Sequence, residues 1–176
     1  MRGQTARAMM TDPQALLSYL DQLGITHETV WHEPLFTVED GLALKAGMAG
    51  AHSKNLLLKD KAGALVLVSA EAHSTLRLNR LHKALGTKRL SFASAEILAQ
   101  VLGVVPGSVT GFALVNDTDG KVRFVMEAAL ADAAEVNFHP LLNTGTTRVS
   151  QADFRRFVEA TGHVVERVDF AAFEQD

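Results

Sequence analysis

Residues 55–70 have the sequence NLLLKDKAGALVLVSA, in which two apolar runs flank a short polar turn. The turn, from Asp60 to Gly63, carries the residue types that favour a tight connection between two strands. Both runs are rich in leucine and valine, which are frequent in buried strands. We therefore predict a β-hairpin over these residues, at the centre of a sheet.

Segments on both sides of this hairpin have helical patterns. Asp12 and Pro13 suit a helix cap and a first helical residue, a leucine stripe follows, and Gly24 ends the segment. Capping residues and apolar periodicity predict four more helices, at residues 37–46, 74–86, 94–102 and 150–158.

Apolar alternation predicts short strands between the helices. These are expected at residues 25–32, 90–92, 135–138, 146–149 and 163–170. A second hairpin is expected, with residues 112–115 and 121–127 as its strands. Strands linked partly by hairpins and partly by single helices indicate an α+β fold, with a mixed, mainly antiparallel, barrel-like sheet flanked by helices.

The composition is that of one globular domain. The chain has 176 residues, of which 47% are hydrophobic and 21% charged, and we expect a disordered leader over residues 1–11 and a single domain over 12–176. The absence of cysteine excludes disulfides, thiolate metal sites and a cysteine nucleophile. The sequence contains neither a signal peptide nor a membrane-spanning run, so we expect a cytoplasmic protein without membrane contact.

Charge is unevenly distributed along the chain. The formal net charge of −3 argues against a general nucleic-acid coat protein. The run from Arg77 to Arg89 contains no acidic residue, however, and predicts a basic patch. The alternative is a solvated helix face with no partner. The candidate residues for contact with an anionic partner are Lys59, Arg80, Lys83, Lys88 and Arg89.

Three polar clusters adjoin the predicted strands and are the candidate chemical groups. Lys54 and Asn55 begin the apolar strand, residues 106–111 form a Pro-Gly turn whose N–H groups can hold an anion, and His139 precedes a proline. Each cluster has a structural alternative: a snorkelling lysine, an ordinary loop and a satisfied core histidine. The other histidines lack metal-ligand spacing and no nucleotide-binding fingerprint is present, so we expect neither metal nor cofactor.

Together these clusters resemble a known family, the YbaK-like editing domains. These domains include the insertion domain of bacterial prolyl-tRNA synthetase and its free-standing relatives. The resemblance extends over nearly the whole chain from Asp12 onward and includes no synthetase catalytic or anticodon-binding region, which indicates a free-standing member. The matching motifs are Ser53-Lys54-Asn55 entering a Leu-rich strand, Pro106-Gly107-Ser108-Val109-Thr110, and Phe138-His139-Pro140-Leu141 with Asn143-Thr144 and Thr146-Thr147.

The resemblance implies hydrolysis of a mischarged aminoacyl-tRNA, and it is strongest to the group that removes alanine from tRNA for proline. On this basis Lys54 is the essential lysine near the terminal adenosine, Asn55 is its neighbour in the site, and Gly107 begins the loop that holds the ester. The family loop ends in proline where this chain has Gly111, a change expected to loosen the loop and to leave the chosen amino acid in doubt. The expected substrate-binding residues are Ser108, Val109, Thr110 and His139.

The implied reaction needs no side-chain nucleophile. An aminoacyl ester is already activated, so a positioned water, assisted by the ribose hydroxyl, and a stabilised oxyanion suffice. Discrimination of alanine from proline would come from excluding the larger ring. The expected partner is tRNA, held at its acceptor stem and 3′ end, while association with prolyl-tRNA synthetase stays open. The residues expected to bind the acceptor stem are the basic ones named above, Lys59, Arg80, Lys83, Lys88 and Arg89. The alternatives are removal of cysteine instead of alanine, and a non-catalytic module that binds tRNA or a synthetase.

Overall fold

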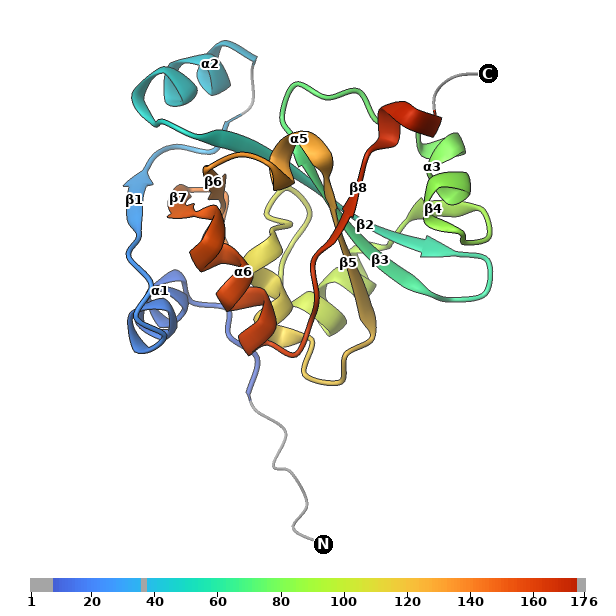
Figure 1. Ribbon diagram of the computed structural model, residues 1–176. Coiled ribbons are helices and arrows are strands. Elements are labelled where there is room, and N and C mark those ends of the chain that lie inside the picture. The colour runs from blue at the N-terminus through green and yellow to red at the C-terminus, as the bar shows by residue number, and fades with distance from the viewer. Residues whose placement is uncertain (1–7, 36–37, 174–176) are drawn as a thin grey trace, which may run out of the picture.

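The computed structural model describes residues 8–35 and 38–173. One sheet of eight strands organises the chain, in the order β1-β7-β6-β2-β3-β5-β8, with β4 paired to β2 (Figure 1). The strands are β1 (Glu28–Trp31), β2 (Ala51–Asp60), β3 (Leu65–Glu71), β4 (Leu90–Phe92), β5 (Val122–Glu127), β6 (Glu135–Phe138), β7 (Gly145–Ser150) and β8 (Glu166–Val168).

The central hairpin is confirmed. β2 and β3 pair antiparallel with Leu57 opposite Leu67, and Asp60 N donates to Ala64 O across the turn at 3.0 Å. The Asp60 carboxylate accepts from the N–H groups of Ala62 and Ala64, both at 2.9 Å, so the turn is closed by side chain as well as backbone. Gly63 supplies the left-handed conformation, with φ +93°.

β2 changes partners along its length. Its first two residues pair with β6, its last three pair with β4, and the middle residues 53–57 have a paired strand on the β3 side alone. Asp60 N and His52 O both bond toward β3, so by the alternation of antiparallel strands the odd-numbered residues turn their backbone groups to the other edge. The pairing of His52 with Asn137 engages one side of this edge, and Leu57 O accepts from Ala93 N at 2.9 Å on the other, so the backbone groups of Asn55 face a gap between β6 and β4.

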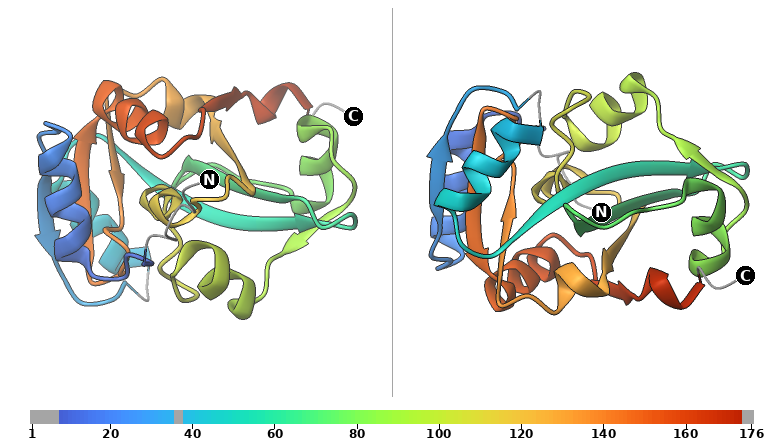
Figure 2. Two further views of the ribbon diagram at one scale, coloured as in Figure 1. Left: turned by 90° about the horizontal axis from the view of Figure 1, so that it is seen from below. Right: turned by 90° about the horizontal axis from the view of Figure 1, so that it is seen from above.

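Helices cover this sheet, and Figure 2 shows α1 at the β1 end of the molecule and α3 at the opposite end. The predicted caps of two helices are confirmed: Asp12 Oδ1 accepts from Gln14 N at 3.0 Å, and Ser150 Oγ accepts from Asp153 N at 3.1 Å. The helices are α1 (Pro13–Gln22), α2 (Val38–Gly47), α3 (Leu78–Leu85), α4 (Ala95–Ile97), α5 (Ala128–Ala131) and α6 (Gln151–Ala160), with the π-helix η1 (Leu98–Leu102) and the 3₁₀ helices η2 (Gly111–Asn116) and η3 (Phe170–Phe173).

Some predicted elements differ from the structure. The helix expected from residue 74 begins at Leu78 with Arg77 as its N-cap, and the Ser74 hydroxyl donates to Glu127 Oε1 at 2.6 Å instead of capping the helix. The second hairpin is wrong: residues 111–116 form the fully buried helix η2, and β5 pairs in parallel with β3. A short apolar run that is buried on all sides has no alternation that distinguishes a strand from a helix.

The core is dominated by aromatic packing behind the sheet. Phe138 stacks on Phe154 with ring centroids 4.4 Å apart, and Phe112 meets Phe138, Phe154 and Phe157 edge-on at 5.2–5.7 Å. η2 thus joins α6 to β6. The predicted α+β class, with a mixed, mainly antiparallel sheet flanked by helices, is confirmed.

The predicted leader, residues 1–11, lies largely outside the described residues. Within the described part, Met10 N donates to Asn116 Oδ1 at 2.6 Å, and Asn116 Nδ2 donates to Met10 O at 2.8 Å. In the described residues we find no helix long and apolar enough to cross a membrane.

Candidate active site

The three predicted clusters meet around one cavity. They come from β2, from the loop before η2 and from the end of β6, which are far apart in the sequence. The cavity has a volume of about 250 Å³ and lies at the gap where the middle of β2 lacks a second paired strand. Its lining residues are Ser53, Lys54, Asn55, Gly107, Val109 and His139.

The β2 wall is held by a chain of side-chain hydrogen bonds. Ser69 Oγ donates to Asn55 Oδ1, Asn55 Nδ2 donates to Ser53 Oγ at 3.1 Å, and Ser53 Oγ donates to Asn137 O at 2.7 Å. Both ends of the Asn55 amide are thus engaged within the protein. Lys54 Nζ donates to Ser74 O, in the segment that leads into α3. The β2 wall is preorganised, because the side chains of Ser53, Lys54 and Asn55 each have a hydrogen-bond partner within the protein.

The loop wall is a turn with Pro106 and Gly107 at its corners. Ser108 N donates to Val105 O at 3.0 Å, and Gly107 has φ +89°, the arrangement of a type II turn. Gly107 is exposed and lines the cavity. The absence of a side chain there leaves the backbone of the turn accessible to a ligand.

The hydroxyls of Ser108 and Thr110 lie on the buried side of this loop, away from the cavity. Ser108 is 1% exposed and its Oγ accepts from Asn143 N at 3.1 Å, which ties the loop to the segment after His139. Thr110 is fully buried and its Oγ1 accepts from Phe112 N at 3.3 Å, which caps η2. These two hydroxyls therefore shape the loop, whereas Gly107 and Val109 line the cavity.

Gly111 packs the loop against the core. A Cβ at this position would lie 2.9 Å from Phe154 Cζ and 3.1 Å from Phe138 Cε1. The backbone therefore approaches the aromatic core more closely than any residue with a side chain could. Gly111 was expected to loosen the loop; in the structure its missing side chain permits a close contact between the loop and the core.

His139 presents one free ring nitrogen to the cavity. Its Nδ1 donates to Gly145 O at 2.8 Å, which leaves the lone pair on Nε2. Burial lowers the pKa of His139 below 6.5; the hydrogen bond to Gly145 opposes this shift, and the nearby His32 ring adds to it. The neutral ring is therefore a hydrogen-bond acceptor at neutral pH.

Two further cavities adjoin this one under α2. A cavity of about 90 Å³ shares Ser53 and His139 with the first and is also lined by Asn137 and Thr146. A larger one of about 450 Å³ lies between β1 and α2, with Leu35 and Leu44 common to it and to the small cavity. A continuous series of hollows thus runs from the Gly107 turn to α2.

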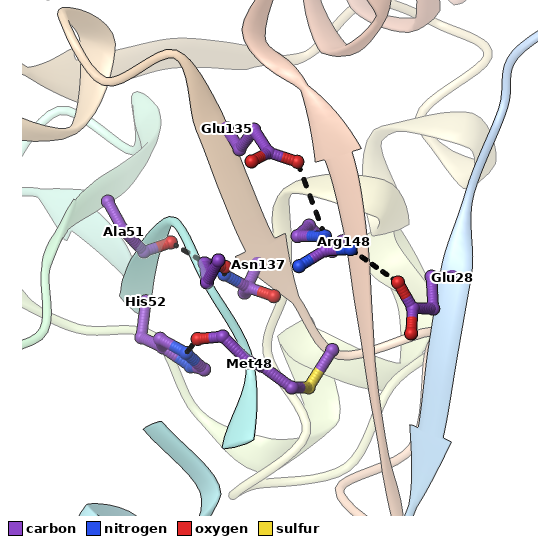
Figure 3. A network of polar contacts seen from close by, with 8 residues as sticks. Glu28, Met48, Ala51, His52, Glu135, Asn137 and Arg148 are labelled. Atoms are coloured by element: carbon purple, nitrogen blue, oxygen red, sulfur yellow. Dashed lines mark hydrogen bonds and ion pairs between the residues drawn. The ribbon is translucent and has the colours of Figure 1, made fainter. Parts of the chain in front are cut away.

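Asn137 also belongs to this site, although no role was predicted for it from the sequence. Figure 3 shows its side chain beside the start of β2, where Nδ2 donates to Ala51 O at 3.2 Å and also to Ala49 O at 3.0 Å. Opposite Asn137 on β7, Arg148 is paired with Glu28 and with Glu135, the latter at 3.3 Å. The available signal was strand alternation, because Asn137 lies two residues before His139 and therefore on the same face.

The candidate tRNA-binding residues lie at the α3 end of the sheet. Lys59 is opposite Ser91 in the β2–β4 pairing, and Lys88 N donates to Asp60 Oδ2 at 3.3 Å. Lys59, Lys83, Lys88 and Arg89 are exposed, and Arg80 is half-buried. Lys54 lines the cavity and donates to the carbonyl of Ser74, in the segment that leads into α3, so the cavity adjoins this surface. The described residues contain no cluster of three side chains able to hold a metal ion.

Comparison with known proteins gives a consistent result. Residues 32–157 match the family model of the aminoacyl-tRNA editing domain. The chain is 40% identical over 154 residues to the prolyl-tRNA synthetase associated domain-containing protein 1 of Bos taurus, covering 85% of this chain and 90% of that one. It is 30% identical over 161 residues to the prolyl-tRNA editing protein ProX of Acetoanaerobium sticklandii, covering 91% and 98%.

Solved structures share the fold. A structure of a candidate trans-editing enzyme for prolyl tRNA synthetase aligns with a TM-score of 0.68 and 16% identity, covering 92% of this chain and 99% of that one. The structure of the hypothetical protein APE2540 aligns with a TM-score of 0.65 and 24% identity, covering 87% and 97%. The overall fold is therefore shared with these proteins.

Proposed function

The chain belongs to the aminoacyl-tRNA editing domain family, and we propose that it is a trans-editing hydrolase that removes a wrongly attached amino acid from tRNA for proline. The observation that carries the proposal is the meeting of Lys54, the Gly107 turn and His139 around one cavity of about 250 Å³. A cation, a glycine turn and a neutral imidazole suit an ester bound to an anionic nucleic acid.

The proposed roles follow from the chemistry of each group. The Lys54 ammonium places the terminal nucleotide, since a flexible point charge suits phosphate and ribose oxygens. The backbone of Gly107 holds the ester carbonyl as negative charge develops on its oxygen. Water is the nucleophile, with the ribose hydroxyl in support, because an aminoacyl ester needs positioning more than a covalent intermediate. Asn55 shapes the wall against which the nucleotide lies.

Alanine is the proposed amino acid. The cavity of about 90 Å³ next to the ester position opens toward α2 and is closed on the β6 side by the buried side chains of Asn137 and Phe138. A close-packed wall rejects a larger ring by steric clash, whereas attraction to one methyl group is worth little. Cysteine is near alanine in size, so rates on the two charged tRNAs, measured side by side, distinguish these substrates.

The acceptor stem is proposed to lie along the α3 end, with Arg80 at the half-buried edge of the contact surface. Lys59, Lys83, Lys88 and Arg89 are exposed there and offer charges to phosphates. This surface continues to the cavity through Ser74, whose carbonyl accepts from Lys54. A stem bound there directs its 3′ end toward the ester position. The soluble pool of charged tRNA places the proposed activity in the cytoplasm.

Deacylation of charged tRNA by the purified protein tests the proposal. Alanyl-tRNA for proline is expected to be hydrolysed and prolyl-tRNA for proline to be spared. Lys54→Ala is expected to lower the rate by at least about 10-fold, while the exposed control Lys61→Ala, in the β2–β3 turn, is expected to leave it unchanged. A purified protein that binds the tRNA and hydrolyses no aminoacyl ester supports a binding module instead. A Lys54→Ala variant at full rate overturns the site assignment.

A further inference from the structure

Asn137 carries a buried acceptor that the protein itself leaves unused. The residue is 1% exposed, and its Oδ1 has no hydrogen-bond partner among the described residues. Buried polar atoms in folded proteins nearly always have a partner, so an unmet one indicates a donor from outside the chain. Asn137 lines the cavity of about 90 Å³ under α2, which has room for such a donor.

The orientation of the Asn137 amide is fixed by the backbone. Nδ2 has two hydrogens, and these reach Ala49 O at 3.0 Å and Ala51 O at 3.2 Å. The flipped amide would set Oδ1 against two carbonyl oxygens. The free end of the side chain is therefore the oxygen, which can only accept.

Strand alternation directs this side chain to the substrate cavity. Val136 belongs to the hydrophobic core, so Asn137, the next residue of β6, turns its side chain to the other face of the strand, and His139 directly follows β6. The same small cavity is lined by Asn137, His139 and Ser53. Figure 3 shows Asn137 between the start of β2 and the strand that carries Arg148.

His139 supplies a second acceptor to the same cavity. Its Nδ1–H is used by Gly145 O at 2.8 Å, so Nε2 keeps a lone pair. The cations near this face have other contacts: Lys45 Nζ lies 3.5 Å from His73 Nε2, and Arg148 pairs with two glutamates. The cavity thus offers two uncharged acceptors, which suit a group rich in N–H donors.

We propose that Asn137 Oδ1 and His139 Nε2 bind the α-amino group of the aminoacyl ester, which makes Asn137 a substrate-binding residue. The inference rests on the proposed function and deepens it, because it says which part of the amino acid is recognised by hydrogen bonds. With the amino group in the small cavity, the ester carbonyl reaches the adjoining cavity beside Gly107, since Ser53 and His139 border both.

The test compares two esters and two proteins. tRNA for proline is charged with alanine or with propionate, in which hydrogen replaces the amino group, and kcat/KM is measured for the wild type and for Asn137→Ala. The variant is expected to lose about 10- to 100-fold on the alanyl ester, as for one hydrogen bond to a charged group, and to change less than about 3-fold on the propionyl ester. An equal loss on both esters overturns the inference, because it reports a structural role.

A second measurement needs no variant. Non-hydrolysable adenosine analogues carrying alanyl or propionyl amides at the 3′ position are titrated into the wild-type protein. The alanyl analogue is expected to bind at least about 10-fold more tightly, and equal affinities overturn the inference. If the wild type hydrolyses alanyl-tRNA but binds both analogues equally, the proposed recognition of the amino group is refuted and the proposed function is not. A wild type without any deacylation refutes the proposed function.

Discussion

Alanine substitutions at Gly107 and Gly63 are a matched pair, because they impose the same backbone strain and only the first lies at the cavity. Both glycines have left-handed backbones, with φ +89° and φ +93°, and both are exposed turn residues. A Cβ at Gly107 would meet only Asn143 Nδ2 at 3.6 Å, and a Cβ at Gly63 would meet nothing within 4 Å. Alanine at either position therefore has room, and its cost is conformational, about 1–2 kcal/mol.

The two alanine variants are expected to melt alike and to differ in activity. For a chain of this length each kcal/mol lowers Tm by about 2–4 °C, so both should melt about 2–8 °C below the wild type. Gly107→Ala also adds a methyl group to a wall of the cavity, and we expect its deacylation rate to fall by at least about 10-fold. Gly63→Ala, in the hairpin turn, should keep its rate at a temperature where both are folded.

Calorimetry and single-turnover deacylation provide the two readouts. A methyl group at residue 107 is expected to slow deacylation because it enters the cavity wall. This explanation would be refuted if the two variants had equal deacylation rates, whether at the wild-type rate or below it. A Gly107→Ala variant that melts far below Gly63→Ala would show instead that the loop has a packing role which the open space around its Cβ does not indicate.

Three further predictions concern packing, pH and charge. Gly111→Ala is expected to lower the free energy of unfolding by about 1–3 kcal/mol in urea, through its contacts with Phe154, whereas Gly41→Ala in α2, with nothing within 4 Å, should not destabilise the protein. The lowered pKa of His139 puts the acid limb of kcat/KM below pH 6.5. It also makes stability fall as pH drops through 6.5, because the unfolded chain takes up the proton first, and His139→Gln should abolish that part of the pH dependence of unfolding. Exposed cations are replaced by glutamine in the variants Lys83→Gln, Lys88→Gln and Arg89→Gln. Each lost phosphate contact is expected to reduce the slope of log affinity for tRNA against log salt concentration by about 0.7–0.9, measured by filter binding. Unchanged slopes would contradict the proposed surface.

Local sequence signals predicted the elements that depend on local chemistry. The hairpin at residues 55–70 and the capped helices α1 and α6 have their determinants within a few residues, and each formed as expected. η2 was missed because its residues are buried on every side, so its hydrophobicity carries no period. The parallel pairing of β3 with β5 depends on contacts across more than 50 residues of sequence, for which a single chain offers no local signal.

Some residues that line the cavity were named from the sequence, whereas the roles of others in the loop were not. Lys54, Gly107 and His139 line one cavity, as their motifs suggested. Ser108 and Thr110 were expected to donate to substrate, but their hydroxyls hold the loop, because a turn must satisfy its own backbone before it can offer groups to a ligand. The unmet Asn137 oxygen could not be inferred from sequence, since it depends on which carbonyls surround the amide.

The cavity exists because β2 serves two parts of the sheet. Its first residues pair with β6 and its last with β4, and between them residues 53–57 lack a second neighbouring strand. A gap in a sheet exposes backbone groups, which an ordinary protein covers. The Gly107 turn and His139 line the cavity together with Ser53 and Asn55, so this edge of β2 forms a wall of the pocket. The apolar hairpin that fixes the centre of the fold therefore also sets the position of the proposed chemistry.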